Sequence, residues 1–424
     1  GDLIFPKQVS VGSIPITRST LLCMKRPPTL CQRSRGYNRM AETLTNPFQV
    51  LTTSEQVSDV ARLLSQQPRI AVDTESNSRH KYPESVCLVQ IATKLGVYLI
   101  DALTVKDMTP IGEVLADASV VKVIQAAAND VLAFDRQWGF RVRNIFDTET
   151  AARFVGFKQT GLSALSESLL GVHMQKDSRI QRSDWTRRPL RQDALVYAAM
   201  DVWHLLDIQG ELERRLQALQ RLEWVSEECA RIEEIRYQPQ DPDSAFLSLK
   251  GSGMLNPQER AVLKRLFTVR ESEARRRGIP PSYVLPHEIL VTLASNPDSD
   301  LSKVPQMRNH VRSRFGNHLR DALQRGLTDP QIRLPTRSIV IRDPLVYDEN
   351  LTILKNWRRS LARQLAIGEA LVWPSRSLER LARAPKEFGA ELKSVEVRKW
   401  QVVQFSASLR SLLPRMRQEA SSVK

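Results

Sequence analysis

The sequence predicts a mixed α/β domain followed by one or two all-helical domains. In the first half, short apolar runs rich in β-branched residues alternate with amphipathic helical patterns, which is typical of a sheet covered by helices. From residue 251 onward only helical patterns occur. The chain has 424 residues, of which 42% are hydrophobic and 26% charged, so it is long enough for two or three domains. No apolar run reaches the length that spans a bilayer, so we expect no membrane association.

We expect four segments, bounded as residues 1–39, 40–250, 251–333 and 334–424. Residues 1–39 are rich in arginine, nearly free of acids and without sustained periodicity, so we expect them to be disordered. A basic, acid-poor leader resembles an organelle transit segment. Met40 is equally an alternative natural start, and we favour the interpretation that the leader is not native.

Charge is divided unevenly along the chain. The net charge of +15 separates into +6 for residues 1–40, −5 for 41–250 and +14 for 251–424. This division favours a catalytic domain joined to a part that binds a polyanion, although solvated basic helix faces would give the same numbers. The histidines lie apart, and the four cysteines follow no zinc or disulfide spacing, so we expect no zinc and a reducing compartment: Cys23, Cys31, Cys87 and Cys229.

The elements of the α/β domain follow from local periodicity. A capped helix begins at Ser54, where an acid and an amide precede apolar residues at helical spacing. Two apolar runs separated by residues 93–95 predict a hairpin. In order, we expect five strands, at residues 70–76, 86–92, 96–100, 120–124 and 145–146, and helices at 111–116, 131–138 and 191–219.

Two carboxylates end the first of these strands. Asp73 and Glu75 are two residues apart, so the period of a strand places both side chains on one face. Oxygen ligands suit Mg²⁺ or Mn²⁺, and like charges this close are costly unless a cation or a proton relieves them. The pair alone is not specific, because a solvated strand end has the same sequence.

Three further residues are candidates for the same site. Asp130 lies where the 120–124 strand passes into a helix, although such an aspartate is often only a helix cap. Tyr197 and Asp201 are four residues apart in a helical pattern, so they share one face. A packed aromatic ring beside a surface charge is the alternative for that pair.

In this order and spacing, these residues resemble the DEDD superfamily of 3′–5′ exonucleases in its tyrosine subclass. Residues 183–190, with the sequence SDWTRRPL, resemble ribonuclease D more specifically. The resemblance covers residues 46–250 and implies a ribonuclease H-like fold. One departure is Gln125-Ala126, where the family often has a His-Gly or His-Ala pair, and it puts substrate contacts in doubt rather than the chemistry.

The resemblance also implies a division of roles around two divalent cations, Mg²⁺ or Mn²⁺. Asp73 is expected to bridge both ions, Glu75 and Asp201 to complete the site that activates water, and Asp130 to support the second ion. Two cations supply the activated water and the charge relief that phosphodiester hydrolysis needs. Because a phenol is a weak base at neutral pH, we expect Tyr197 to orient the water rather than to deprotonate it.

The C-terminal part resembles the HRDC domain, a small helical module that binds nucleic acid. The match runs from about residue 256 to 327, and residues 348–413 repeat its order of elements more weakly. We expect phosphate contacts from a set of arginines in these helices: Arg275, Arg276, Arg277, Arg312, Arg314, Arg358 and Arg359.

The predicted function is a metal-dependent 3′–5′ exoribonuclease that releases nucleoside 5′-monophosphates and trims RNA 3′ ends, with tRNA precursors as substrate. We expect a cytoplasmic monomer, or a protein of an organelle matrix if the leader is a transit segment. A DNA exonuclease of the Werner or proofreading type and a non-catalytic RNA-binding protein are the alternatives. No Gly-x-x-x-x-Gly-Lys-Ser/Thr loop is present, which argues against a helicase. Recognition of the 2′-hydroxyl, which separates RNA from DNA, cannot be read from the sequence.

Overall fold

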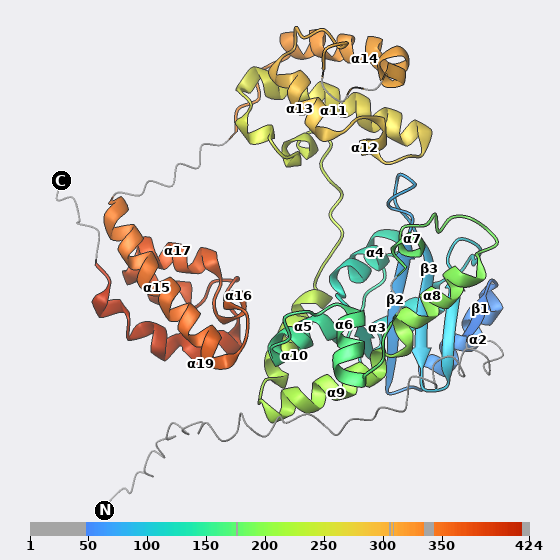
Figure 1. Ribbon diagram of the computed structural model, residues 1–424, viewed down its shortest axis with the longest axis vertical. Coiled ribbons are helices and arrows are strands. Elements are labelled where there is room, and N and C mark those ends of the chain that lie inside the picture. Colours follow the sequence, from blue (N-terminus) through green and yellow to red (C-terminus); the bar gives the residue numbers. More distant parts are fainter. Residues whose placement is uncertain (1–47, 175–176, 305–306, 308, 335–342, 418–424) are drawn as a thin grey trace, which may run out of the picture. The chain divides into compact units, whose positions relative to one another are not determined.

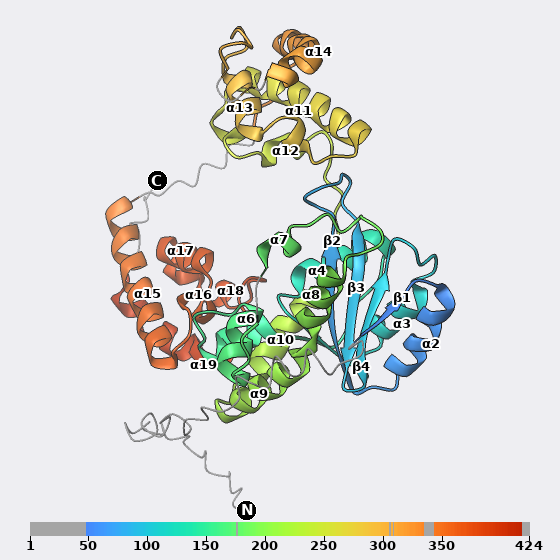
Figure 2. The same cartoon turned by 45° about the vertical axis from the view of Figure 1, so that its right-hand side comes forward.

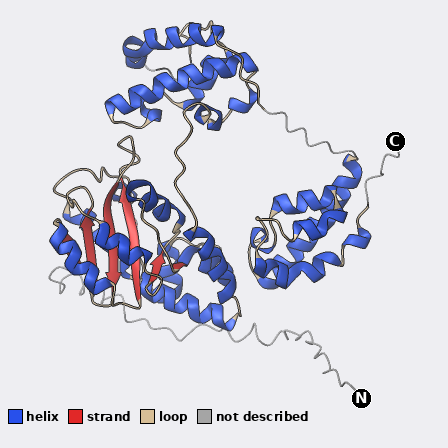
Figure 3. Cartoon of the chain, turned by 180° about the vertical axis from the view of Figure 1, so that it is seen from behind, coloured by secondary structure: helices blue, strands red, loops and turns tan. Residues whose placement is uncertain are grey.

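A computed structural model describes residues 48–424 except 175–176, 305–306, 308, 335–342 and 418–424 (Figure 1). The leader expected at residues 1–39 lies outside the described part. Strands occur only in the first half of the described chain, and the remainder consists of helices and their connections (Figure 3). Within the described residues, no helix is both long and apolar enough to cross a membrane.

One mixed sheet organises the first half, and it confirms the predicted α/β class. The strand order is β1-β4-β3-β2-β5-β6. Strands β2, β3 and β4 are antiparallel neighbours, and the expected hairpin joins β3 to β4, whereas β5 and β6 run parallel to β2. The strand bounds are Phe48–Leu51 for β1, Arg69–Ser76 for β2, Val86–Thr93 for β3, Gly96–Asp101 for β4, Val121–Ile124 for β5 and Ile145–Asp147 for β6.

Within the described residues the sheet has six strands, not the five that the sequence predicts. The missed strand is β1, which pairs in parallel with β4 at the edge of the sheet. Its four residues are buried only at the two ends, Phe48 and Leu51, so they lack the alternation that marks a half-buried strand. The partner lies about fifty residues away in the sequence, and a pairing of that kind leaves no local pattern.

Helix α8 (Gln192–Trp203) packs against β2, β3 and β4 (Figures 1 and 2). Ala194, Ala198 and Ala199 are buried on this helix, and their small side chains allow a close approach to the strands. The single helix expected over residues 191–219 is in fact two helices, because the chain turns at His204 before α9 (Leu205–Ala218). This turn frees α9 to pack on α5 (Thr148–Val155).

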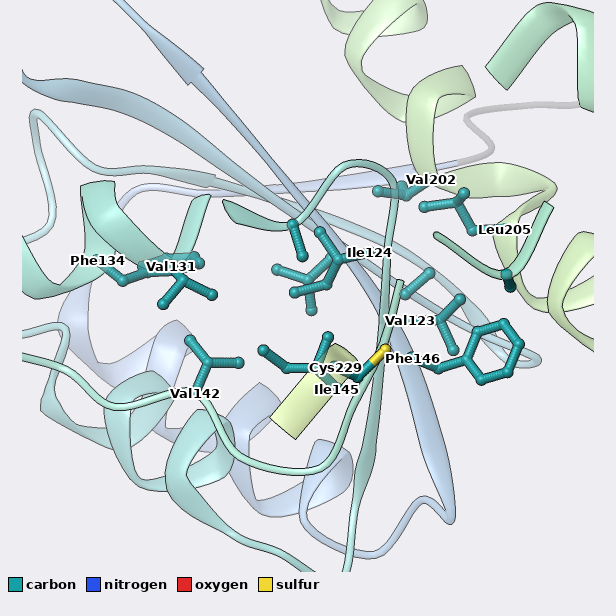
Figure 4. Close-up of a cluster of buried hydrophobic side chains, with 14 of the residues drawn as sticks. Val123, Ile124, Val131, Phe134, Val142, Ile145, Phe146, Val202, Leu205 and Cys229 are labelled. Carbon is teal, nitrogen blue, oxygen red and sulfur yellow. The ribbon is translucent and has the colours of Figure 1, made fainter. Parts of the chain in front are cut away.

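Apolar residues from several of these elements form one core beneath the last two strands of the sheet. Val123 and Ile124 of β5 and Phe146 of β6 lie in a cluster with Val202 of α8 (Figure 4). Cys229 of α10 belongs to the same buried cluster, which explains its burial without any metal or disulfide. The other helices of this half are α2 (Ser54–Leu64), α3 (Thr109–Ala116), α4 (Ala128–Trp138), α6 (Leu162–Leu165), α7 (Ser178–Gln181) and α10 (Leu222–Glu233).

The first helical region has its own hydrophobic core. Its longest helix, α11, begins with a capping box formed by Asn256 and Glu259 and ends at Gly278, whose φ of 61° lies in the left-handed region. A long helix is thus followed by a one-turn helix, a nine-residue helix and a second long helix. These are α11 (Pro257–Arg277), α12 (Pro281–Val284), α13 (His287–Ser295) and α14 (Asn309–Thr328).

The last helical region, residues 344–417, begins with the same order of helix lengths. A 22-residue helix ends at Ala366, which is again left-handed with a φ of 52°, and four-residue and nine-residue helices follow. Its helices are α15 (Pro344–Leu365), α16 (Glu369–Val372), α17 (Ser375–Arg383), α18 (Phe388–Glu391) and α19 (Lys399–Arg410).

Helix α19 is in contact with α10 through aromatic and ionic groups. The rings of Trp224 and Trp400 stack with centroids 4.5 Å apart. Arg398 donates to both carboxylate oxygens of Glu228, at 2.9 and 3.1 Å. Glu227 accepts hydrogen bonds from the first two backbone N–H groups of α19. The last helical region therefore shares a continuous hydrophobic cluster with the α/β domain.

Candidate active site

Strand β2 presents the first two acids of the site. The strand enters the sheet through the buried run Ile70-Ala71-Val72 and then carries Asp73 and Glu75, which are only partly exposed. In the antiparallel ladder Asp73 is opposite Gln90 and Glu75 is opposite Leu88, so both carboxylates lie on the same face, as predicted. The register shifts between Glu75 and Ser76, and Ser76 then pairs with Val86.

Asp130 reaches the same place from the first turn of α4. The chain turns sharply between β5 and α4 at Ala126, whose φ of 57° is unusual for a residue with a β-carbon. The N–H group of Ala126 donates to Asp147 Oδ1 at 2.8 Å, which holds this conformation. Thr74 Oγ1 donates to Asp130 Oδ1 at 2.6 Å. Thr74 thus ties the β2 acids to Asp130.

Tyr197 and Asp201 face the site from α8, one turn apart, as the sequence predicts. The Tyr197 hydroxyl lies close enough to the Asp201 carboxylate for each group to affect the pKa of the other. Burial raises the pKa of Tyr197 far above its ordinary value, and the charges of Asp201, Glu75 and Asp73 raise it further. The phenol is therefore a hydrogen-bond donor and not a base in this environment.

The acids act on one another electrostatically. Burial, followed by the charges of Asp130, Asp201 and Glu75, raises the pKa of Asp73 well above its usual range. Burial and the charges of Asp201 and Asp130 raise the pKa of Glu75 to about 9. Burial raises the pKa of Asp130 and of Asp201 to about 7. The structure thus brings all four predicted acids into one site whose negative charge is uncompensated.

The donor chemistry of this site fits a hard divalent cation, because carboxylate oxygens are the ligands that Mg²⁺ and Mn²⁺ prefer. Among the described residues, however, no group of three or more His, Cys, Asp or Glu side chains is arranged to hold an ion. The four acids are an electrostatic cluster and not a closed cage. Water and phosphate oxygens would have to complete the coordination of any bound cation, as is usual for Mg²⁺.

A partly buried ion pair, which the sequence interpretation missed, lies beside Tyr197. Arg188 donates from Nε and Nη2 to both oxygens of Asp101 at 2.5 and 2.6 Å, and from Nη1 to the carbonyl of Trp185 at 2.7 Å. Trp185 is buried, and its ring centroid lies 6.4 Å from that of Tyr197. The SDWTRRPL sequence contains both Arg188 and Trp185, so the sequence pointed to these two residues. Nothing in the sequence identifies Asp101 as the partner of Arg188.

The Gln125-Ala126 departure has a structural explanation. Gln125 accepts a hydrogen bond from the Thr148 hydroxyl at 2.6 Å and donates to the Thr160 carbonyl at 2.9 Å. Its amide is therefore engaged within the fold. Asp147 is a second residue that the sequence did not indicate, because its role depends on the left-handed backbone of its distant partner Ala126.

The predicted phosphate-binding arginines are not equivalent. Arg358 donates to Ser375 Oγ at 2.8 Å, and only 12% of its side chain is exposed, so it stabilises the last helical region. Arg276 and Arg359 are exposed but form ion pairs with Glu273 and Glu369, at 2.7 and 3.4 Å. The remaining members of the set lie on α11 and α14, exposed or partly exposed: Arg275, Arg277, Arg312 and Arg314.

Comparison with known proteins agrees with this geometry. Residues 48–217 match the model of a 3′–5′ exonuclease family, and residues 259–323 match the HRDC domain. The ribonuclease D of Gluconacetobacter diazotrophicus is 30% identical over 343 residues, which cover 80% of this chain and 86% of the relative. The ribonuclease D of Granulibacter bethesdensis is 33% identical and covers 78% and 85%.

Solved structures show the same fold. The crystal structure of Escherichia coli RNase D, described as an exoribonuclease involved in structured RNA processing, superposes with a TM-score of 0.68 at 24% identity, covering 88% of this chain and 100% of the other. The catalytic core of RRP6 from Trypanosoma brucei gives a TM-score of 0.58 at 24% identity, covering 68% and 81%.

Proposed function

The chain belongs to the ribonuclease D family of 3′–5′ exoribonucleases, and we propose that Asp73, Glu75, Asp130, Tyr197 and Asp201 form its active site. The observation that carries this proposal is that four acids from three elements come close enough for the charges of Asp130 and Asp201 to raise the pKa of Asp73 and Glu75, while burial raises the pKa of all four. Perturbed carboxyl groups are typical of functional sites, and a bound cation would compensate their charge.

Members of this family use divalent metal ions, and we propose that this chain holds two, Mg²⁺ or Mn²⁺. When bound, two cations supply an activated water and relieve charge on the phosphoryl and leaving oxygens. The charges of all three other acids act on Asp73, and it is the residue we assign to both ions. Glu75 and Asp201 would complete one ion site, and Asp130, fixed by Thr74, would support the other.

Tyr197 contributes by orientation. Its hydroxyl keeps its proton because the buried ring is close to three carboxylates. It can donate one hydrogen bond and accept another, which suffices to fix the direction of an attacking water. The packing of Trp185 against the ring, secured by the ion pair of Arg188 with Asp101, fixes where that hydroxyl points.

The substrate class that we propose is structured RNA, with tRNA precursors as the first candidate. One structural relative is described as acting in structured RNA processing. Here the charge of +14 in residues 251–424 offers a surface for the backbone of a folded RNA. We propose that Arg275, Arg277, Arg312 and Arg314 contact phosphates, and we leave out Arg358 because it is enclosed.

The boundaries 40–250, 251–333 and 334–424 remain our proposal for the catalytic domain and two HRDC-like domains. The shared order of helices supports a repeat, since in both regions a long helix ends in a left-handed residue and is followed by four-residue and nine-residue helices. We further propose that the chain acts as a monomer in the cytoplasm, as the sequence favours.

The proposal is tested with the full chain on a tRNA precursor labelled at either its 5′ or its 3′ end. Stepwise shortening of the 5′-labelled RNA in Mg²⁺, with early release of labelled mononucleotide from the 3′-labelled RNA, is expected. A chelator should abolish both. Preferential degradation of a matched single-stranded DNA would identify a DNA exonuclease instead, and binding without cleavage would identify an RNA-binding protein.

A further inference from the structure

A buried amide next to the acids has no hydrogen-bond partner. Gln90, in the middle of β3, is fully buried, and in the described part of the chain neither its Oε1 nor its Nε2 is hydrogen-bonded. Leaving buried polar groups unpaired costs about 1–3 kcal/mol each. The buried Gln209 on α9 shows the usual solution, because its Oε1 accepts from Arg69 at 2.5 Å and its Nε2 donates to Glu213 at 2.7 Å.

The position of Gln90 in the sheet identifies the group it can serve. Its backbone is directly opposite Asp73 in the β2–β3 ladder, so the two side chains lie on one face. Opposed β-carbons in such a ladder are about 4.5–5.5 Å apart, within reach of an amide and a carboxylate. On the other side Gln90 is opposite Leu99 of β4, which offers no hydrogen bond.

We propose that Gln90 is a positioning residue for the metal site, whose Nε2 donates a hydrogen bond to the Asp73 carboxylate and fixes the orientation in which Asp73 binds a divalent cation. This inference rests on the proposed function. It explains why an amide occurs in this strand. Apart from Gln90 and Thr93, the side chains of β3 are apolar: Val86, Cys87, Leu88, Val89, Ile91 and Ala92.

The chemistry of an amide suits this role. Asp73 is surrounded by other acids, and an ionised carboxylate only accepts hydrogen bonds, so its neighbour must donate. A lysine at position 90 would donate but would also carry the charge that the cation must supply. A neutral amide holds one carboxylate oxygen and leaves the other oxygen to the metal. Partners of this kind orient metal ligands, and their loss typically costs about 10–100-fold in metal affinity.

The test compares Gln90→Met and Gln90→Leu with the unaltered full chain by titration with Mn²⁺, measured by electron paramagnetic resonance without RNA. We expect the Mn²⁺ dissociation constant to rise about 10–100-fold in both variants. In chelator, we expect urea unfolding to show stability equal to or above that of the unaltered chain, because an unpaired buried amide has been replaced by an apolar group of similar size. Met and Leu differ in shape, so an effect seen in both variants cannot come from the packing of one particular side chain.

Gln209→Met is the matched control. It removes a buried amide whose hydrogen bonds are satisfied within the fold, so it should lower stability in chelator and leave Mn²⁺ affinity unchanged. Unchanged Mn²⁺ affinity in both Gln90 variants would overturn the inference. A loss of stability as large as that of Gln209→Met would overturn it too, because the amide of Gln90 would then be paired in the metal-free fold. Failure of the unaltered chain to bind Mn²⁺ would instead contradict the proposed metal site itself.

Discussion

Removing one acid from the site should stabilise the metal-free protein at alkaline pH. Burial raises the pKa of Asp201 from 3.8 to about 7. Between these two values the folded chain holds a proton that the unfolded chain has released, so the free energy of unfolding falls as pH rises from about 4 to about 7. Asn at position 201 stays neutral at every pH and can still accept a hydrogen bond from Tyr197, so Asp201→Asn avoids this loss.

The size of the effect follows from the pKa difference. A shift of about three units at about 1.4 kcal/mol per unit gives about 4 kcal/mol as an upper bound for the pH-dependent term. Neighbouring acids of the site do not titrate independently, so the realised gain is smaller, and we expect about 1–3 kcal/mol above pH 7. At about pH 4 the carboxyl is protonated in the folded state and only partly ionised in the unfolded state, so the variant should gain little from charge removal.

The measurement is urea unfolding in chelator at several pH values between about 4 and 8, for the unaltered chain, Asp201→Asn and Asp207→Asn. Asp207 is an exposed aspartate at the start of the next helix, and Asp207→Asn serves as the control for removing an aspartate outside the site. Added Mg²⁺ should stabilise the unaltered chain at pH 8 and the Asp201→Asn variant much less. A variant that is equally destabilised at both ends of the pH range would show that ionised Asp201 carries no burial cost, and the electrostatic argument for the site would fail.

Three further predictions concern activity and binding. Asp73→Asn should lower the rate of RNA cleavage by several orders of magnitude with little change in RNA affinity, since a ligand charge is lost while the fold is kept; near-normal cleavage would contradict the two-metal proposal. Tyr197→Phe should lower the turnover rate by about 10²-fold without changing thermal stability, and a loss confined to RNA affinity would make the tyrosine a binding residue. The double variant Arg277→Glu, Arg314→Glu should weaken binding of a tRNA precursor. It should also reduce the slope of log affinity against log salt concentration by about 0.7–0.9 for each phosphate contact removed. Affinity is titrated at several salt concentrations in an Asp73→Asn background, and equal slopes would show that these arginines do not contact phosphates.

The convergence of four of these residues was predictable in part, because they lie in two local patterns. Asp73 and Glu75 follow a continuous apolar run, and Tyr197 and Asp201 lie at helical spacing among buried alanines. The resemblance to a known family then joined these separate patterns. Asp130 needed that resemblance most, because an aspartate in the first turn of a helix is common for reasons of capping alone.

What the sequence could not supply depends on pairing between distant residues. The partner of Arg188 is Asp101, 87 residues earlier, and the partner of Ala126 is Asp147. Strand β1 forms by pairing with β4, about fifty residues later in the chain. In each of these pairs, at most one partner lies in a recognisable sequence pattern. The other partner can be identified only from the folded structure. The proposed role of Gln90 also could not be predicted from the sequence, because it depends on the pairing of Gln90 opposite Asp73 in the sheet.

The structure also changes how the division of charge should be tested. Several arginines that contribute to the +14 of residues 251–424 are engaged within the fold, such as Arg380, which donates to Glu391 and Glu396, and Arg398, which is paired with Glu228 of α10. Net charge therefore overstates the surface available to RNA. Ending the chain near residue 250 would also leave Trp224 without the ring of Trp400 on which it stacks, so a truncated protein would lose stability for reasons unrelated to RNA. Charge reversal on α11 and α14 leaves that aromatic contact intact, and it separates the loss of phosphate contacts from the loss of folding.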